Sequence, residues 1–371
     1  MKMTAGYKIL HKKQRLRAAI FGAGTISRKE LQKKTGLNYR SVIAYAEELK
    51  HQGLIAENTQ ENPRGGRSSI HYRSCSDCIY CIAVQLYRNN VTLTAADINS
   101  NIFHAAELVI PPEAGITDML RQILGALDTL KKSFPDCTLA GIELCRFPYG
   151  RSGDYYEGIR ELHMTLRQQY RFPVGLHTSY DLILFQMARN FDLKERLVLL
   201  APGDDIYLSM VENREINGDM EQYLHRFRHY QLSMKSQEKC YCGKQRCVKN
   251  LLTQAAQLSR YNHYAGIDRP YASLSEGLHY LCTQALKNER AAVRILEECG
   301  ELTAEAMYFL KKDLQADHVL LYFKDAVVNR KMHEAYERIS GEKLPEFSAF
   351  GVTRSDVQSA SVRIALSRII P

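Results

Sequence analysis

The sequence has no run of about 18 or more consecutive apolar residues, so we expect no membrane-spanning helix. No apolar stretch follows the start, Met1 to Thr4, so we expect no secretory signal peptide and a cytoplasmic protein. Cysteine is sparse, with ten in 371 residues, which excludes a disulfide scaffold and predicts mostly reduced thiols. No internal repeat is visible. The content of 45% hydrophobic and 25% charged residues predicts a globular protein of about two or three domains.

The net charge of +9 is unevenly distributed. Residues 1–74 carry eight Lys and seven Arg against five Glu, a net charge of +10, and the other 297 residues sum to −1. A strongly basic end joined to a neutral remainder is typical of a nucleic-acid-binding module. A solvated basic face without a partner is the alternative, and charge alone does not decide between the two.

Local signals in the basic end predict a winged helix-turn-helix. Ser27 with Glu30 three residues later is a capping box, which starts a helix that Gly36 would end. Asn38 can cap the next helix, whose apolar residues recur at helical spacing up to Gly53. Two short helices joined by a turn with glycine form the helix-turn-helix pattern. A strand, a polar loop and a second strand then predict a wing over residues 54–72.

In this arrangement the second helix of the pair enters the major groove with its first residues nearest the bases. Arginine pairs with guanine and asparagine with adenine, although Asn38 can also serve only as a helix cap. The residues predicted to face double-stranded DNA are Asn38, Tyr39, Arg40 and Ser41 on the helix and Arg64 and Arg67 at the wing tip. A three-helix protein–protein module is the alternative, and the charge of +10 argues against it.

The remaining chain alternates strands with helices, which predicts an α/β architecture. The expected strands cover residues 79–86, 91–96, 105–109, 139–144, 197–201, 206–211 and 319–322. Amphipathic stretches cover residues 116–133, 155–170 and 182–190, and residues 251–315 are expected to be largely helical.

Three cysteines, Cys240, Cys242 and Cys247, lie within eight residues around a glycine. Zinc favours four tetrahedral thiolate and imidazole ligands, so three sulfurs need one more. The nearest imidazoles are His229 and His225. We predict a structural zinc site, with three reduced surface thiols as the alternative.

The winged helix-turn-helix, the wing motif Gly65-Gly66-Arg67, the α/β domain and the cysteine cluster together resemble the ROK family (repressors, open reading frames and kinases) over nearly the whole chain. The segment 25–31 at the entry to the second helix and the stretch 350–365 carry the resemblance too. It implies a two-lobed, actin-like sugar-kinase fold, assembled as homodimers or homotetramers. It also implies a zinc bound by one His and three Cys beside a sugar pocket, and His229 matches that His better than His225.

The expected domains are therefore a DNA-binding domain over residues 1–74, a linker over 75–78 and a ROK-like domain over 79–371. We expect one lobe over residues 79–190 plus 350–371, and the other over 191–349.

Departures from the family pattern predict that the domain is catalytically silent. The family's first phosphate loop, Asp-x-Gly-x-Thr, corresponds to residues 85–89 here, which lack the acid and the glycines. The family's catalytic Asp belongs to an Asn-Asp pair, which corresponds to Thr178-Ser179 here, and Asp181 lies two residues too late to act as the base. The second phosphate loop, residues 203–207, carries two carboxylates that would repel phosphates. An active sugar kinase with an extra basic domain is the alternative.

Two acids that the resemblance places in the sugar pocket are cations here, Arg226 and Lys249. One interpretation is an anionic effector such as a sugar phosphate or sugar acid. The other is a pocket that binds no small molecule. The candidate effector residues are Ser179, Arg226, His229 and Lys249. We expect a DNA-binding transcriptional regulator, with repression as the expected mode; a purely structural zinc protein would leave the localised charge unexplained.

Overall fold

The structure is a computed structural model of the chain. No helix among the residues that it describes is long and apolar enough to cross a membrane. The chain divides into two compact units, residues 1–177 with 358–371, and residues 178–357. The structure describes residues 12–13, 15–17, 19–21, 23, 25–51, 53–60, 69–75, 79–87, 90–98, 100–111, 114–147, 153–170, 172–188, 191–192, 194–213, 215–217, 220–234, 239–268, 271–344 and 354–369.

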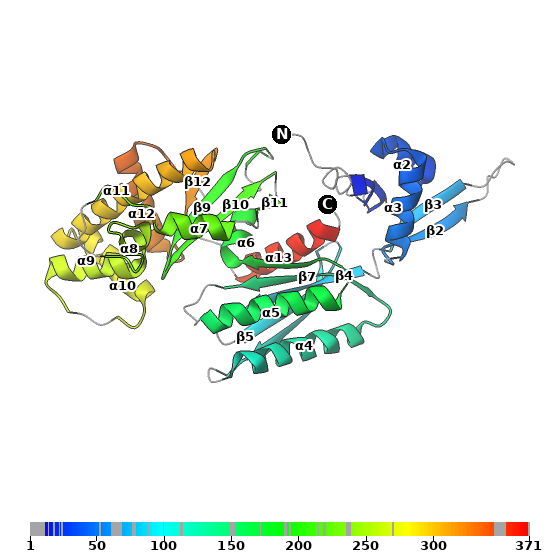
Figure 1. The fold of residues 1–371 in the computed structure, drawn as a ribbon, viewed down its shortest axis with the longest axis horizontal. Helices are drawn as coiled ribbons and strands as arrows, with labels where there is room; N and C mark the ends of the chain where they lie inside the picture. The colour runs from blue at the N-terminus through cyan, green and yellow to red at the C-terminus, as the bar shows by residue number, and fades with distance from the viewer. Residues whose placement is uncertain are drawn as a thin grey trace. The chain divides into compact units, whose positions relative to one another are not determined.

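Among the described residues, the N-terminal part of the first unit contains helical residues between positions 12 and 23, two further helices and a three-stranded sheet. Helix α2 (Arg28–Thr35) and helix α3 (Tyr39–His51) are joined by residues 36–38. Strands β1 (Thr25–Ser27), β2 (Ile55–Gln60) and β3 (Ser69–Ser74) form an antiparallel sheet in the order β1-β3-β2. Figure 1 shows β2 beside β3. Leu16, Leu31, Val42 and Leu49 are buried between these elements, so the apolar spacing of the sequence forms their shared core.

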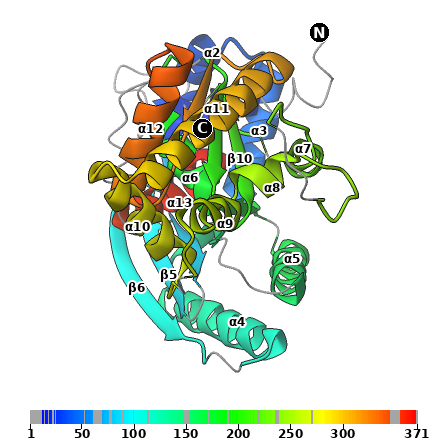
Figure 2. The ribbon, with the colours of Figure 1, turned by 90° about the vertical axis from the view of Figure 1, so that its left-hand side faces the viewer.

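The rest of the first unit is built on a five-stranded sheet in the order β6-β5-β4-β7-β8. Its strands are β4 (Ile79–Leu86), β5 (Asn90–Asp97), β6 (Ile102–Val109), β7 (Thr138–Arg146) and β8 (Val174–Thr178). Strands β4 and β7 are parallel, whereas β5 and β6 pair as an antiparallel hairpin at one edge (Figure 2). All eight residues of β4 are buried, as expected for a central strand covered on both faces.

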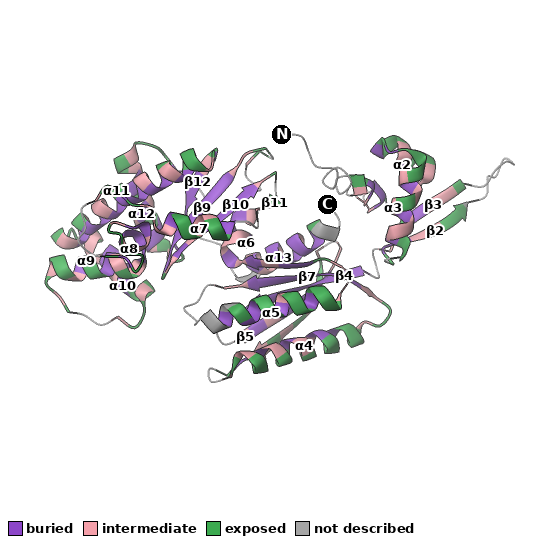
Figure 3. Ribbon diagram, in the orientation of Figure 1, coloured by how far each residue is buried: buried purple, intermediate pink, exposed green. Residues whose placement is uncertain are grey.

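Helices cover both faces of this sheet. Helices α4 (Ile116–Ser133) and α5 (Gly153–Gln169) pack on the face that carries Tyr80, Ile82 and Val84, with their exposed residues turned away from it (Figure 3). Helix α13 (Arg354–Ile369) packs on the other face, where Val362 contacts Cys81. The alternation of β4 residues between the two faces follows from the period of two along a strand.

The second unit contains a four-stranded sheet in the order β11-β10-β9-β12. Its strands are β9 (Leu197–Pro202), β10 (Ile206–Glu212), β11 (Glu215–Ile216) and β12 (His318–Leu321), with β9 parallel to β12 and antiparallel to β10. Helix α6 (Ser179–Met187) packs against β9 and β10. The second unit therefore begins at Thr178, earlier than the boundary after residue 190 that the sequence led us to expect.

Six further helices are found among the described residues of the second unit. They are α7 (Met220–Arg228), α8 (Val248–Leu252), α9 (Gln254–Ala265), α10 (Leu274–Leu286), α11 (Arg290–Asp313) and α12 (Ala326–Ser340). Each contributes buried side chains to one core with Val198 and Leu200 of β9. This core holds α7 and α8, the two helices that flank the cysteine cluster.

Candidate functional sites: a nucleic-acid interface and a metal centre

Side-chain and backbone bonds at the start of α2 and α3 fix the helix-turn-helix. The Glu30 carboxylate accepts hydrogen bonds from the Ser27 backbone N–H (3.0 Å) and hydroxyl (2.7 Å), and the Ser27 hydroxyl accepts one from the Glu30 N–H (3.2 Å). This is the capping box that the sequence predicts. Gly36 ends α2 with φ 62°, a left-handed conformation that favours glycine. The turn between the helices is thus set by local chemistry.

The four residues predicted to face DNA lie at the beginning of α3. The Asn38 side-chain oxygen accepts a hydrogen bond from the Ser41 N–H (2.8 Å), so Asn38 caps the helix. A bidentate contact to adenine needs that same oxygen, which favours the capping role. Tyr39 is 52% exposed, and Arg40 is exposed as well. The wing residues Arg64 and Arg67 lie outside the described residues.

Acidic residues of this region form ion pairs with lysines of the same region. Glu48 pairs with Lys13 (2.6 Å), and Lys50 lies 3.6 Å from Glu47 and 3.5 Å from Glu57. Among the described residues up to Cys75, seven exposed cations form no ion pair: Lys12, Arg15, Lys29, Lys33, Lys34, Arg40 and Arg73. Four of them, Lys29, Lys33, Lys34 and Arg40, belong to α2 and to the first turn of α3. More than half of the uncompensated cations of this region therefore lie on the helix pair.

Arg28 plays a different part from these cations. Its guanidinium donates a hydrogen bond to the Tyr72 hydroxyl (2.7 Å) and lies 3.5 Å from the Glu57 carboxylate, with only 17% of the side chain exposed. Burial lowers the pKa of Arg28, but hydrogen bonds with Tyr72 and Tyr39 and the charge of Glu57 outweigh it and raise the pKa. Arg28 thus joins α2 to β2 and β3, and it contributes charge without being available to DNA.

The second site is a group of four ligand-type side chains. One ligand atom each of His229, Cys240, Cys242 and Cys247 lies within 4.8 Å of all the others, and His225 is not part of the group. The Cys240 Sγ lies 3.5 Å from His229 Nδ1, and the Cys242 and Cys247 sulfurs are 3.6 Å apart. A tetrahedral zinc with ordinary bond lengths needs S–S edges of about 3.8 Å and S–N edges of about 3.6 Å. The residues therefore fit a zinc ion.

A short hairpin presents these ligands. Cys240 and Gly243 close a turn through the Gly243 N–H bond to the Cys240 carbonyl (2.8 Å), and Gly243 has φ 83°. No atom lies within 4 Å of a Cβ added at Gly243, so the backbone angle, not the space, requires glycine there. His229 follows α7 directly, and Cys247 is the N-cap of α8. The helices thus hold the ligands on both sides of the turn.

Electrostatics at this group suit a cation. The Lys244 backbone N–H lowers the pKa of Cys242, whereas burial raises the pKa of Cys247 to about 12. Burial, followed by the positive charge of His225 and Lys249, lowers the pKa of His229. A neutral imidazole is the form that binds a metal. Closely spaced thiols resist joint ionisation, and a divalent cation would relieve that repulsion.

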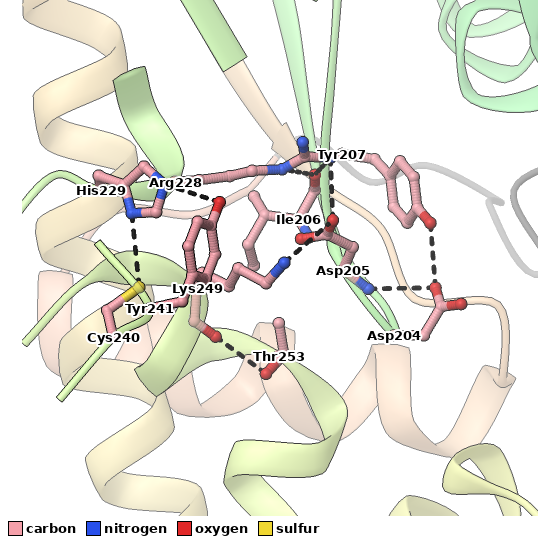
Figure 4. A network of polar contacts seen from close by, with 10 residues as sticks. All are labelled: Asp204, Asp205, Ile206, Tyr207, Arg228, His229, Cys240, Tyr241, Lys249 and Thr253. Carbon is pink, nitrogen blue, oxygen red and sulfur yellow. Dashed lines mark hydrogen bonds and ion pairs between the residues drawn. The ribbon is translucent and has the colours of Figure 1, made fainter. Parts of the chain in front are cut away.

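A polar network joins the metal-ligand group to the turn between β9 and β10 (Figure 4). His229 Nε2 lies 2.9 Å from the Tyr241 hydroxyl, and the Lys249 ammonium lies 5.3 Å from the centre of the Tyr241 ring. Lys249 in turn lies 3.5 Å from the Asp205 carboxylate, which Arg228 also contacts at 3.1 Å. The sequence alone predicted no role for Tyr241 and suggested only that Asp205 would repel phosphates. Arg228 and Lys249, the cations that contact Asp205, lie on other elements of the chain.

The effector candidates already have partners within the protein. Arg226 is exposed and lies over the Tyr223 ring, 5.6 Å from its centre, whereas Lys249 pairs with Asp205. His229 belongs to the metal-ligand group. Ser179 is buried at the first position of α6. Among the described residues, no hydrogen bond or ion pair links Arg226 to the other three.

Asp181, the acid nearest to the family's catalytic position, forms a capping box. Its carboxylate accepts hydrogen bonds from the Thr178 N–H (2.7 Å) and hydroxyl (2.8 Å), and the Thr178 hydroxyl accepts from the Asp181 N–H (3.2 Å). This carboxylate starts helix α6. In the nearby β9–β10 turn, Asp204 accepts a hydrogen bond from the Tyr207 hydroxyl at 3.1 Å. Both acids therefore serve local structure.

Comparisons with known proteins relate the whole chain to regulators and its larger part to kinases. No family model matches the sequence. The chain is 22% identical over 347 residues to the DNA-binding transcriptional dual regulator NagC of Escherichia coli K12, covering 84% of this chain and 83% of that protein. The N-acetylglucosamine repressor of Shigella flexneri matches to the same extent.

Among solved structures, a ROK family transcriptional regulator, a homologue of E. coli MLC, matches 97% of this chain and 98% of its own with a TM-score of 0.65 and 14% identity. The ROK hexokinase of Thermus thermophilus matches 78% of this chain and 99% of its own, with a TM-score of 0.57 and 14% identity. These likenesses confirm the predicted fold class. The hexokinase match omits about a fifth of the chain that the regulator match includes.

Proposed function

We propose that the chain is a DNA-binding transcriptional regulator of the ROK family, with repression as its expected mode. It is similar in sequence to the regulator NagC and in fold to a ROK family transcriptional regulator. One observation carries the proposal: exposed cations without acidic partners gather on the helix pair α2 and α3. Lys29, Lys33, Lys34 and Arg40 form this surface, which we call the α2–α3 cation surface. The NagC-like regulators that match over 84% of the chain support the same role.

We propose a division of labour within this surface. Arg40 and Ser41, at the start of α3, would read base edges in the major groove, because Asn38 is engaged in capping. Tyr39 would flank them, and Lys33 and Lys34 would contact phosphates, which position a protein without specifying sequence. Arg64 and Arg67 stay wing candidates on the evidence of sequence alone.

The salt dependence of DNA affinity tests this proposal on the full-length chain. Each phosphate contact changes the slope of log affinity against log salt by about 0.9. The variant Lys33→Ala/Lys34→Ala should therefore flatten the slope by roughly two for each DNA-bound protomer, with operator and random duplexes affected alike. The matched control is Lys312→Ala, an exposed lysine of α11 in the second unit, which should leave the slope unchanged. Equal slopes for all three proteins would contradict the proposal.

We propose further that the ROK-like domain does not phosphorylate sugars. A sugar kinase needs a carboxylate free to take a hydroxyl proton. Asp181 is used by the Thr178 capping box, and Asp205 is bound by two cations. The kinase alternative has structural neighbours in its favour, but those kinases cover only 78% of this chain. Residues 1–74, which we propose as the DNA-binding domain, make up about a fifth of the chain.

A zinc ion bound by His229, Cys240, Cys242 and Cys247 is the proposed cofactor. Zinc would supply folding energy to the hairpin, because its four ligands come from separate short segments. Arg226, Lys249, His229 and Ser179 stay the proposed effector residues for an anionic sugar derivative. An effector would have to displace Asp205 from Lys249, so its binding would change the β9–β10 turn.

We propose that the regulator acts as a homodimer or homotetramer. A twofold dimer presents two recognition helices to two half-sites of related sequence, about one helical turn apart or a multiple of it. Such a regulator works where the DNA is, and we propose a cytoplasmic protein on that ground.

A further inference from the structure

Tyr241 lies between two proposed metal ligands in the chain, and its side chain reaches a third. The residue is 73% exposed, yet its hydroxyl lies 2.9 Å from Nε2 of His229. The two rings meet edge to face, with centres 4.9 Å apart and planes at 82°. An exposed tyrosine has no packing reason to hold this orientation, so the contact with the imidazole defines it.

The contact has a chemical consequence for His229. Its Nδ1 faces the Cys240 sulfur at 3.5 Å, so Nδ1 is the nitrogen aimed into the thiol group. A neutral imidazole carries one N–H, and only the other nitrogen offers a lone pair to a metal. If the Tyr241 oxygen accepts from Nε2–H, the lone pair stays on Nδ1. A partner on the outer nitrogen therefore selects the tautomer and the ring orientation that metal binding needs.

The tyrosine is itself held in place. The Lys249 ammonium lies over its ring at 5.3 Å, and Asp205 holds that ammonium at 3.5 Å. Asp205 also pairs with Arg228, the residue directly before His229. The contacts thus form a closed circuit from His229 through Tyr241, Lys249, Asp205 and Arg228 back to His229 (Figure 4).

We propose that Tyr241 is a positioning residue for the metal ligand His229, selecting the imidazole tautomer that leaves Nδ1 free for zinc. The inference rests on the zinc site proposed above. It adds to that site a residue, Tyr241, that does not bind the metal but raises the affinity of the site for zinc. Lys249 and Asp205 orient the tyrosine and so connect the metal centre to the β9–β10 turn.

The test measures zinc affinity of the full-length protein by competition with a chromophoric chelator. Tyr241→Phe keeps the ring and the contact with Lys249 but removes the hydroxyl, and zinc affinity should fall by about 10- to 100-fold. The matched control is Tyr264→Phe. Tyr264 also has its hydroxyl bonded, to Arg294 at 3.0 Å, and a cation over its ring at 4.0 Å, but on α9. The Tyr264→Phe variant should bind zinc with the affinity of the wild-type protein.

A second readout separates positioning from general damage. In cobalt-substituted Tyr241→Phe the ligand-field spectrum should keep its tetrahedral intensity, and the His229 Nε2–H should exchange with solvent faster than in wild type. Zinc affinity within twofold of wild type, or an equal loss in Tyr264→Phe, would overturn the inference. Wild-type protein that binds no zinc would overturn the zinc site itself, which distinguishes the two failures.

Discussion

Removal of the Arg40 guanidinium tests the recognition helix directly. Arg40 is the second residue of α3, exposed and without an ion pair among the described residues. Arg40→Ala therefore breaks no contact within the protein that the structure records. The free energy of unfolding should stay within about 0.5 kcal/mol of wild type, as for ordinary surface substitutions. Any large change in DNA affinity then reports a contact with DNA.

The expected loss follows from the kind of contact. A bidentate arginine–guanine pair contributes about 1–3 kcal/mol of discrimination, which corresponds to roughly 5- to 150-fold in affinity for each protomer. A lone phosphate contact would reduce affinity for all sequences alike. The control is Lys50→Ala, at the other end of α3, about 15 Å away by helix geometry. Lys50 pairs with Glu47 and Glu57, so its loss should change affinity by less than about threefold.

The assay is fluorescence anisotropy with full-length protein, using an operator selected from random-sequence duplexes and one scrambled duplex at fixed salt. The operator-to-scrambled ratio should fall in Arg40→Ala and stay constant in Lys50→Ala. An equal loss on both duplexes would assign Arg40 to phosphate, and an equal effect of the two substitutions would refute the placement of α3 in the groove.

Three further results are expected. Zinc, measured by elemental analysis, should be stoichiometric in wild type and His225→Ala but lost in His229→Ala; the reverse pattern would make His225 the fourth ligand. A coupled kinase assay across hexoses and amino sugars should detect no turnover in wild type; enzyme-like rates abolished by Asp181→Asn would show that Asp181 is a base. In denaturant unfolding, Asn38→Ala should lower the free energy of unfolding by about 1 kcal/mol. Asn38→Ser keeps a helix cap, so it should retain both stability and DNA affinity. A loss of DNA affinity in Asn38→Ser at full stability would mean that Asn38 reads a base.

Features with local causes could be predicted from the sequence. The Ser27 capping box and the end of α2 at Gly36 depend on residues within a few positions of one another. The cysteine cluster belongs to the same class, because its three thiols lie within eight residues. In these segments the hydrogen-bonding and backbone preferences of neighbouring residues determine the structure.

Features that join distant segments could not be predicted. Strand β1 is three residues long and exists because Thr25–Ser27 pairs with β3. Asp205 looks like an unpaired acid in sequence, and only the fold brings Arg228 and Lys249 to it. No sequence spacing encodes such pairings. The start of α6 has a local cause instead: Thr178 and Asp181 form a capping box, so the helix begins at Ser179 and not at residue 182 as expected.

The central claim is that the chain binds specific DNA sequences through α3. The most direct measurement is sequencing of the fragments that purified full-length protein retains from sheared genomic DNA of its own organism at physiological salt. We predict a recurrent motif made of two related half-sites, which disappears from the fragments retained by Arg40→Ala. Retained fragments without a shared motif, or a motif unchanged in Arg40→Ala, would contradict the account.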